Sequence, residues 1–350
     1  MRVHLPVRQA ILDRHTYEAP AEGRWGKIRL DFNENTTGCS KAALAALRRL
    51  SRQELAMYPE YQEPTKVLAR YFGVRTSEIL LTNGGDDALR VFFDTFVEPG
   101  SHILICEPTF PMYRYYAEIA GARVEALRYS ANMEFPLPAV LKALKKKPRV
   151  FFLANPNNPT GTLVDKFAIQ KMLRTAAHTV VVLDEAYADF SGLTVVPWIR
   201  RHANLFVAKT FSKTAGLAGL RLGAVMAQAS SLGLVRRAMP PFPVNTAALV
   251  ASVATIRERR TLARYIRETI RLRDWFAAEL VRRKVCVFPS ACNFLLADFG
   301  AAGPVFFRRC TQNGILLRER SKDLGPGFAR ITIGTPAELK TLLRILDGEK

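Results

Sequence analysis

The stretch LFVAKTFSKTAGLAGLRLG, residues 205–223, begins with a short apolar run and continues into a polar, glycine-rich segment. The run has the length and continuity of a strand that is buried on both faces of a mainly parallel sheet. Lys213 follows its end, between the hydroxyls of Thr210 and Ser212 and the guanidinium of Arg221. Partial desolvation at such a place lowers the pKa of a lysine and makes its amine a nucleophile. A lone lysine after a strand is usually a solvated surface residue. Whether Lys213 is a functional residue therefore depends on the motifs elsewhere in the chain.

Four other short apolar runs also end in unusual polar clusters. They are EILLTNGGDD (78–87), HILICEPTFPMY (102–113), VFFLANPNNPTG (150–161) and VVVLDEAY (180–187). Helical patterns such as KFAIQKMLRTAAH (166–178) lie between them. This alternation predicts an α/β fold, in which ligands bind beyond the carboxyl ends of the strands. We therefore expect the five polar clusters to meet at one edge of the sheet.

The two ends of the chain have a different pattern. Three short strand candidates, CNFLLADF, GILLRER and ARITIGT, follow an arginine-rich helical segment at 257–284. Near the N-terminus, Ser40 is a good helix cap before KAALAALRRL. We predict a large domain over residues 45–245 and a smaller α+β domain built from residues 1–44 and 246–350.

Composition argues against several classes of function. The chain has 350 residues and a formal charge of +20, but the basic residues are dispersed and no nucleic-acid motif accompanies them. The five cysteines lack paired spacing and the five histidines form no HxxxH pattern, so we expect reduced thiols and no metal site. The first residues have scattered charges and no apolar segment typical of a signal peptide, and no apolar run is long enough to span a membrane, so we expect a cytoplasmic protein.

Three of the polar clusters each have a purely structural interpretation and a functional one. Gly84 and Gly85 form either an ordinary tight turn or a helix start that binds phosphate. Asp184, at the end of an apolar strand, is either a helix cap or a buried carboxylate with a cationic partner. Asn158 lies either in a rigid turn or in a position to present its amide to a ligand.

One cofactor needs all of these features together. Pyridoxal phosphate requires a lysine for its Schiff base, an anionic partner for its pyridinium nitrogen and donors for its phosphate. The combination of Lys213, Asp184 and the Gly84–Gly85 turn fits that requirement better than any of the three does alone.

Taken together, the motifs of this sequence resemble those of a known family. From LDFNENTTG through MYPE, NGGDD, EPTFPMY, NPNNPTGT, DEAYADF and SKTAGLAGLRLG to ARITIGT, it is similar to the fold-type I pyridoxal-phosphate aminotransferases. Within them it resembles the histidinol-phosphate aminotransferase group. The resemblance implies a large domain with a mainly parallel seven-stranded sheet, a smaller α+β domain and a homodimer with shared active sites.

The resemblance also implies the roles of individual residues. Lys213 would form the Schiff base and transfer protons, Asp184 would pair with the pyridinium nitrogen, and Asn158 and Tyr187 would bind the phenolic oxygen. The residues expected around the cofactor phosphate are Gly84, Gly85, Asp86, Thr210, Ser212, Arg221 and, from the neighbouring subunit, Tyr58. The residues expected at the substrate are Arg330, which would grip a carboxylate, and Arg318, Asn33 and Tyr17.

One position departs from the family pattern. The histidinol-phosphate enzymes usually carry a tyrosine after EPT, stacked on the cofactor ring, whereas this chain has Phe110. Stacking is retained, but the hydroxyl is lost, which weakens the substrate assignment.

We expect amino transfer between histidinol phosphate, as in histidine biosynthesis, and 2-oxoglutarate by a ping-pong mechanism. The alternatives are an aromatic or other amino-acid aminotransferase, a decarboxylase of threonine phosphate, or a regulator that uses this fold to bind an effector.

Overall fold

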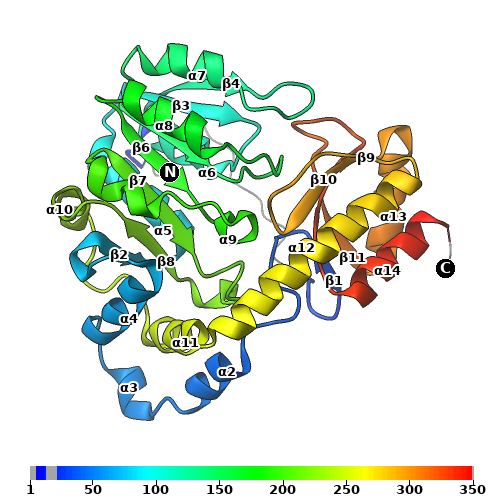
Figure 1. Ribbon diagram of the computed structural model, residues 1–350, viewed down its shortest axis with the longest axis horizontal. Coiled ribbons are helices and arrows are strands. Elements are labelled where there is room, and N and C mark those ends of the chain that lie inside the picture. The colour runs from blue at the N-terminus through cyan, green and yellow to red at the C-terminus, as the bar shows by residue number, and fades with distance from the viewer. Residues whose placement is uncertain (1–4, 13–21, 349–350) are drawn as a thin grey trace.

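The computed structural model describes residues 5–12 and 22–348, which form two β-sheets that lie side by side (Figure 1). The larger sheet has seven strands in the order β2-β8-β7-β6-β5-β3-β4. Their bounds are β2 (Ile79–Thr82), β3 (His102–Glu107), β4 (Arg123–Arg128), β5 (Val150–Ala154), β6 (Val180–Asp184), β7 (Leu205–Thr210) and β8 (Gly223–Met226). All of them run parallel except β8, which is antiparallel to both of its neighbours. The predicted α/β fold with a mainly parallel seven-stranded sheet is confirmed.

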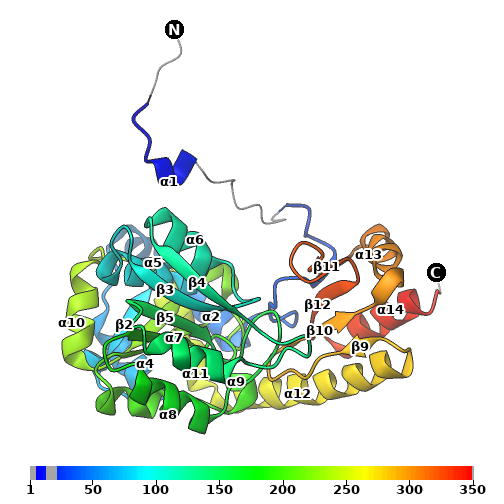
Figure 2. The ribbon, with the colours of Figure 1, turned by 90° about the horizontal axis from the view of Figure 1, so that it is seen from above.

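Helices cover both faces of this sheet. In chain order the first eight helices are α1 (Gln9–Leu12), α2 (Lys41–Arg48), α3 (Arg52–Ala56), α4 (Gln62–Phe72), α5 (Gly84–Phe96), α6 (Met112–Ile119), α7 (Leu137–Leu144) and α8 (Lys166–Thr175). The other six are α9 (Ala188–Ser191), α10 (Ala229–Arg237), α11 (Thr246–Arg257), α12 (Arg259–Arg282), α13 (Gly303–Gln312) and α14 (Pro336–Leu346). Helices α5 and α6 lie on one side of the sheet and α7 and α8 on the other (Figure 2).

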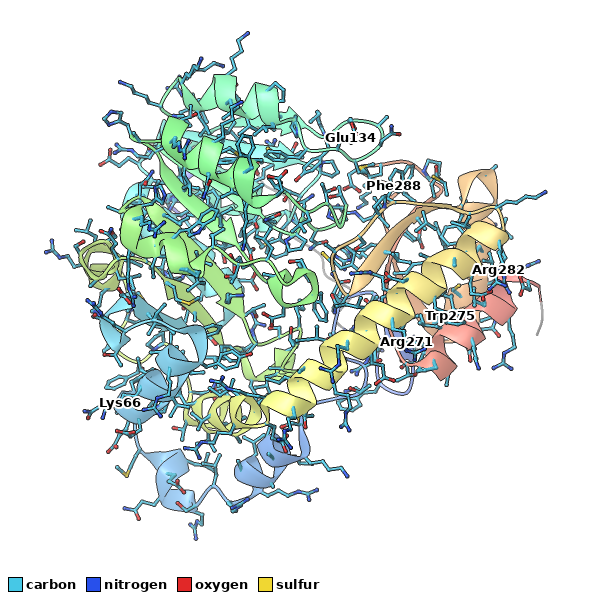
Figure 3. All side chains as sticks on the ribbon, viewed as in Figure 1. Lys66, Glu134, Arg271, Trp275, Arg282 and Phe288 are labelled. Atoms are coloured by element: carbon cyan, nitrogen blue, oxygen red, sulfur yellow. The ribbon has the colours of Figure 1, made fainter. Side chains whose placement is uncertain are left out.

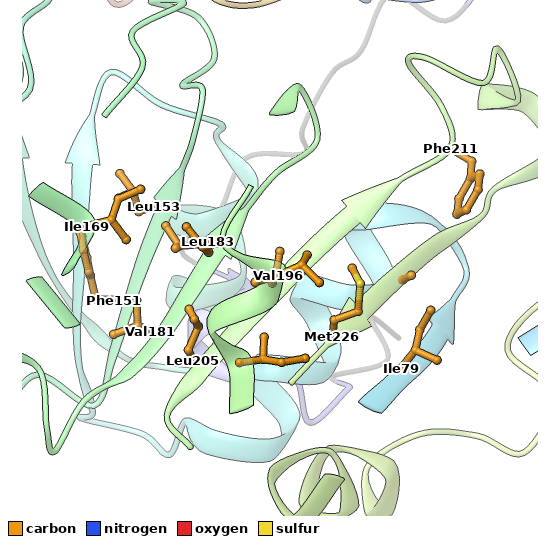
Figure 4. Close-up of a cluster of buried hydrophobic side chains, with 14 of the residues drawn as sticks. Ile79, Phe151, Leu153, Ile169, Val181, Leu183, Val196, Leu205, Phe211 and Met226 are labelled. Atoms are coloured by element: carbon orange, nitrogen blue, oxygen red, sulfur yellow. The ribbon is translucent and has the colours of Figure 1, made fainter. Parts of the chain in front are cut away.

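Side chains that alternate along each strand of the larger sheet contribute to the two hydrophobic cores, one on each face of the sheet. Phe151 and Leu153 of β5 point into the cluster that includes α7 and α8, which Figure 4 shows in close-up. Val150 and Phe152 of the same strand point into the cluster on the opposite face, with α5 and α6. All four side chains are buried because successive residues of a strand face opposite ways. This double burial is why the strands are continuous apolar runs in the sequence.

The smaller sheet has five strands in the order β1-β11-β12-β10-β9. Their bounds are β1 (Ile28–Leu30), β9 (Cys286–Val287), β10 (Phe294–Asp298), β11 (Ile315–Glu319) and β12 (Phe328–Thr332). The three predicted C-terminal strands are confirmed as β10, β11 and β12. Strand β1 pairs in parallel with β11, so a segment from the start of the chain is fixed against one from its end.

The long helix α12 runs beside the smaller sheet and reaches back to the larger unit (Figure 1). Leu272 and Phe276 of this helix are buried in the core of the smaller sheet. Ala248 and Leu249 of α11 pack instead in the core of the larger sheet. The division into residues 45–245 and residues 1–44 with 246–350 stays a prediction.

Local signals set several helix ends. Ser40 caps α2 by accepting a hydrogen bond from the backbone N–H of Ala43 at 3.1 Å, as predicted. Thr335 and Glu338 form a capping box at the start of α14.

Within residues 5–12 and 22–348, none of the helices has the length and apolar character needed to cross a membrane.

Candidate active site

A cavity of about 460 Å³ lies where the carboxyl ends of β5, β6 and β7 meet the smaller sheet. That volume is in the range of small-molecule and cofactor sites. Twelve of the predicted site residues line it: Gly85, Asp86, Phe110, Asn158, Asp184, Tyr187, Thr210, Ser212, Lys213, Arg221, Arg318 and Arg330. The polar clusters therefore meet at one edge of the sheet, as their positions after the strands predict.

Lys213 lies just beyond β7, with its amine held inside the cavity. Its Nζ donates a hydrogen bond to the carbonyl oxygen of Phe32 at 2.8 Å. Burial, together with the positive charge of Arg330, lowers the pKa of Lys213 to about 8. A sizeable fraction of this amine is uncharged near neutral pH, so Lys213 is able to act as a nucleophile and as a base.

Asp184 occupies the end of β6 and is held by two donors. The hydroxyl of Tyr113 donates to Oδ2 at 2.8 Å, and the backbone N–H of Ala186 donates to Oδ1 at 3.0 Å. Burial raises the pKa of Asp184 despite these two hydrogen bonds. A carboxylate in such surroundings is stabilised by a cationic partner in the cavity, such as a protonated ring nitrogen.

The N-terminus of α5 and the β7–β8 connection form a compact cradle. Gly84 has φ +81°, and a Cβ built there would lie only 2.6 Å from Nη2 of Arg221. Arg221 forms an ion pair with Asp86 at 3.1 Å, and the Thr210 hydroxyl donates to Oγ of Ser212 at 2.9 Å. A helix N-terminus beside an arginine and two hydroxyls is suited to a phosphate group.

Arg330 reaches the cavity from β12 in the smaller sheet. Its Nη1 donates to Oδ1 of Asn158 at 2.5 Å, and its Nη2 donates to the carbonyl oxygen of Asp31. Its Nε is buried without a hydrogen-bond partner. Burial lowers the pKa of Arg330 to about 10. This guanidinium is desolvated and incompletely paired, which favours binding of an anion.

Two further arginines line the same cavity, at the end of β11. Arg318 belongs to the predicted set, whereas Arg320 was missed. The pattern RER, with arginines two residues apart, was the available signal, because such residues face the same side of a strand. Tyr113 was not predicted either, because an aromatic residue at the start of a helix is usually a residue of the hydrophobic core.

Three of the predicted residues that the structure describes do not line the cavity, and a fourth lies outside the described part of the chain. Asn33 is fully buried, and Gly84 is buried with the Arg221 guanidinium beside it. Tyr58 is 76% exposed, with its ring stacked on Phe242 at a centroid distance of 4.5 Å. Tyr17 lies outside the described residues.

No metal centre is formed by the residues that the structure describes. Within them, no three side chains of His, Cys, Asp or Glu come together as ligands would.

The family of the chain follows from its sequence as a whole. The family model described as "Aminotransferase class I and II" matches residues 26–346, which include every residue of the cavity. The chain belongs to this family. It is therefore an aminotransferase, and the family indicates pyridoxal phosphate as its cofactor.

Relatives of this aminotransferase carry one name in particular. The histidinol-phosphate aminotransferase of Geobacillus thermodenitrificans is 34% identical, over 88% of this chain and 86% of that protein. The protein of the same name from Roseiflexus castenholzii is 33% identical, over 91% of this chain and 88% of that protein.

A solved structure shares the fold of the aminotransferase. The histidinol-phosphate aminotransferase of Sinorhizobium meliloti, solved in complex with pyridoxal-5'-phosphate, superposes with a TM-score of 0.90. The match covers 99% of both chains at 22% sequence identity. The fold-type I architecture predicted from the sequence is thereby confirmed.

Proposed function

We propose that this aminotransferase binds pyridoxal phosphate in the cavity and exchanges amino groups between histidinol phosphate and 2-oxoglutarate. The observation that carries the proposal is that three arginines, Arg318, Arg320 and Arg330, line the same cavity as the low-pKa amine of Lys213. An anionic amino donor and a dicarboxylic oxo acid both need such cations. The name shared by the relatives supports histidinol phosphate as the donor.

The residues present fit the cofactor. Asp184 is a buried carboxylate with a raised pKa and would pair with the ring nitrogen. Gly84 has a φ of +81°, which strains any residue with a Cβ, and a Cβ there would also displace the Arg221 guanidinium from the cradle. The residues that would hold the phosphate are Gly85, Asp86, Thr210, Ser212 and Arg221. Asn158 and Tyr187 would bind the phenolic oxygen, and Phe110 would pack on the ring.

The chemistry depends on where protons are held. When bound, pyridoxal phosphate withdraws electrons from the bond between the substrate Cα and its hydrogen. Lys213 Nζ accepts that proton and later donates it again, so its pKa near 8 is close to the value that general base catalysis favours. Tyr113 holds the Asp184 carboxylate in place by donating to Oδ2.

The two substrates would share one set of cations in turn, as a ping-pong mechanism requires. Histidinol phosphate offers a phosphate and 2-oxoglutarate offers carboxylates, and both are suited to the fork-shaped donors of arginine. Tyr58 would reach the cofactor phosphate of the neighbouring subunit, and a cytoplasmic homodimer with shared sites is part of the proposal.

An aromatic amino acid is the second candidate donor. Leu89, Phe110 and Met112 form an apolar wall of the cavity that would accept an aromatic side chain. The absence of a hydroxyl at Phe110 also removes one polar contact that a phosphorylated substrate would use.

A half-reaction test separates these candidates. Cofactor-loaded protein is mixed with histidinol phosphate, phenylalanine, tyrosine, aspartate or threonine phosphate, and loss of the visible absorption of the lysine–cofactor linkage is followed. We expect histidinol phosphate to react fastest, and a faster reaction with phenylalanine or tyrosine would favour the aromatic candidate. Release of CO₂ from threonine phosphate would indicate a decarboxylase.

Lys213→Ala is the matched control for this experiment. The variant should bind the cofactor without the absorption of the lysine linkage and should not respond to any donor. Retention of that absorption in Lys213→Ala would show that another amine carries the chemistry.

A further inference from the structure

Asn33 is held on every side although it does not line the cavity. It is fully buried and has φ +55°, a conformation that asparagine tolerates better than most residues. Its backbone N–H donates to Oγ1 of Thr332 at 3.0 Å, and its carbonyl oxygen accepts from Nδ2 of Asn293 at 3.1 Å. Its side-chain Nδ2 donates to the hydroxyl oxygen of Tyr187 at 2.9 Å.

The hydrogen-bond network fixes which way the Asn33 amide faces. The Thr332 hydroxyl oxygen accepts the backbone N–H of Asn33, so its own proton is free to be donated. It donates to Oδ1 of Asn33 at 3.2 Å. The amide oxygen therefore faces Thr332 and the amide nitrogen faces Tyr187.

This orientation has a consequence for the Tyr187 proton. Because Nδ2 of Asn33 can only donate, Tyr187 uses its oxygen as the acceptor there, and its O–H points elsewhere. Its ring is held edge-on against Phe294 at a centroid distance of 5.1 Å, and Tyr187 lines the cavity. The direction left for the proton is the cavity, where the phenolic oxygen of the cofactor is expected.

We propose that Asn33 is a positioning residue that aims the hydroxyl proton of Tyr187 into the cavity. This inference rests on the proposed function, in which Tyr187 donates to the phenolic oxygen of pyridoxal phosphate. It replaces the expectation that Asn33 contacts substrate, because Asn33 acts through Tyr187 from behind the cavity wall. Burial raises the pKa of Tyr187, so its proton is retained across the working pH range.

Asn33→Asp tests the inference with almost no change of shape. The new carboxylate can only accept, so the Tyr187 proton turns toward it and away from the cavity. The phenolic oxygen of the bound cofactor then loses a donor, and its greater negative charge holds the proton of the lysine–cofactor linkage to higher pH. We expect the pH midpoint of the visible absorption to rise by about one unit, in the same direction as in Tyr187→Phe.

Two further variants keep the test decisive. Asn33→Asp added to Tyr187→Phe should shift the midpoint by less than Asn33→Asp does in the wild type, because the donor is already gone and only the charge of the new carboxylate acts. Thr332→Val leaves Asn33 in place but frees its amide to turn, so the midpoint should rise by a smaller amount even if Asn33→Asp folds poorly. Asn33→Gly, which tolerates the positive φ, gives the effect of removing the side chain, and thermal unfolding monitors folding in every variant.

The outcomes distinguish this inference from the proposed function. A shift in Tyr187→Phe with unchanged midpoints in Asn33→Asp and Thr332→Val would overturn the positioning role alone. An unchanged midpoint in Tyr187→Phe would overturn the assigned role of Tyr187 and the inference with it.

Discussion

Two lysines four residues apart have opposite electrostatic surroundings. Burial alone would lower the pKa of Lys209, but the carboxylates of Glu185 at 3.1 Å and Asp189 at 3.5 Å raise it overall. Lys213 hydrogen-bonds only a backbone oxygen among the contacts of the described residues, and its pKa falls. The first lysine is therefore held as a cation, whereas the second has the lowered pKa that its proposed role requires.

The lowered pKa of Lys213 predicts a pH dependence of stability in the cofactor-free protein. Between pH 8, near the lowered pKa, and pH 10.5, the ordinary pKa of a lysine, the unfolded chain holds a proton on this residue that the folded chain has lost. Stability therefore rises with pH across this window, by up to about 1.4 kcal/mol per unit from this group. Urea unfolding at pH 7.5 to 10.5 should show a shallower rise in Lys213→Met, and parallel curves would contradict the low pKa.

Tyr113→Phe should weaken cofactor binding without unfolding the protein. The change removes the donor to Asp184, whose pKa rises further, so the carboxylate becomes a poorer partner for a ring cation. We expect about a tenfold increase in the dissociation constant of pyridoxal phosphate, measured by absorbance titration. Tyr115→Phe, on the same helix but outside the cavity lining, is the matched control and should bind normally.

The residues of the cavity differ in how well the sequence predicts them. Lys213 and Asp184 were predictable because they follow strands whose ends must meet at one edge. Tyr113 was not, because its ring packs in the core and only its hydroxyl reaches the site. The placement of Asn33 depends on a hydrogen bond to Thr332, which is distant in the sequence and which no local pattern predicts.

At the scale of elements, β8 is the strand that brings Arg221 to the start of α5. It runs against its neighbours and places Gly223 opposite Thr82 of β2. A Cβ built on Gly223 would lie 2.6 Å from the backbone of Gly84. The strand can approach the start of the helix this closely because position 223 is glycine.

Gly223→Ala should therefore distort the cradle. Backbone atoms cannot move away as a flexible side chain would, so we expect a loss of about 2 kcal/mol in unfolding free energy and weaker binding of inorganic phosphate. Gly233→Ala in α10 is the control, because a Cβ there meets nothing within 4 Å and alanine favours a helix. Equal stability of the two variants would contradict the close packing described here.

The strands differ in how clearly the sequence predicts them. Five strands of the large sheet were identified individually because both of their faces are buried. Strand β4 lies at the edge of the sheet and carries exposed arginines at both ends, so it lacks a continuous apolar run. Strand β8 has only four residues, and β1 and β9 are shorter still.

At the scale of the whole molecule, much of the basic charge lies away from the cavity. Arg260, Arg264, Arg267 and Arg271 are exposed along one face of α12, and Arg271 and Arg282 are labelled in Figure 3. The opposite face of the helix buries Leu262, Leu272 and Phe276, so α12 is amphipathic. We therefore attribute the net charge of +20 mainly to solvated surfaces and not to the site.

The proposed shared site makes a prediction about mixed subunits. Tyr58→Phe and Lys213→Ala should each be weakly active or inactive alone. Mixed under conditions of demonstrated subunit exchange, they should regain activity, because a hybrid dimer has one site with both an intact lysine and an intact partner tyrosine. The absence of recovery despite exchange would argue against Tyr58 acting across subunits.

The bond between Asn33 and Thr332 joins residues 299 positions apart in the chain. On the ribosome, Asn33 is synthesised long before its partner, and the strands of the larger sheet are complete while β12 is still missing. In the arrangement we propose, a nascent chain at that stage already carries Lys213 and Asp184 but lacks the residue that turns the Asn33 amide toward Tyr187. The proposed direction of the Tyr187 proton is therefore set only after β12 has been synthesised and has paired.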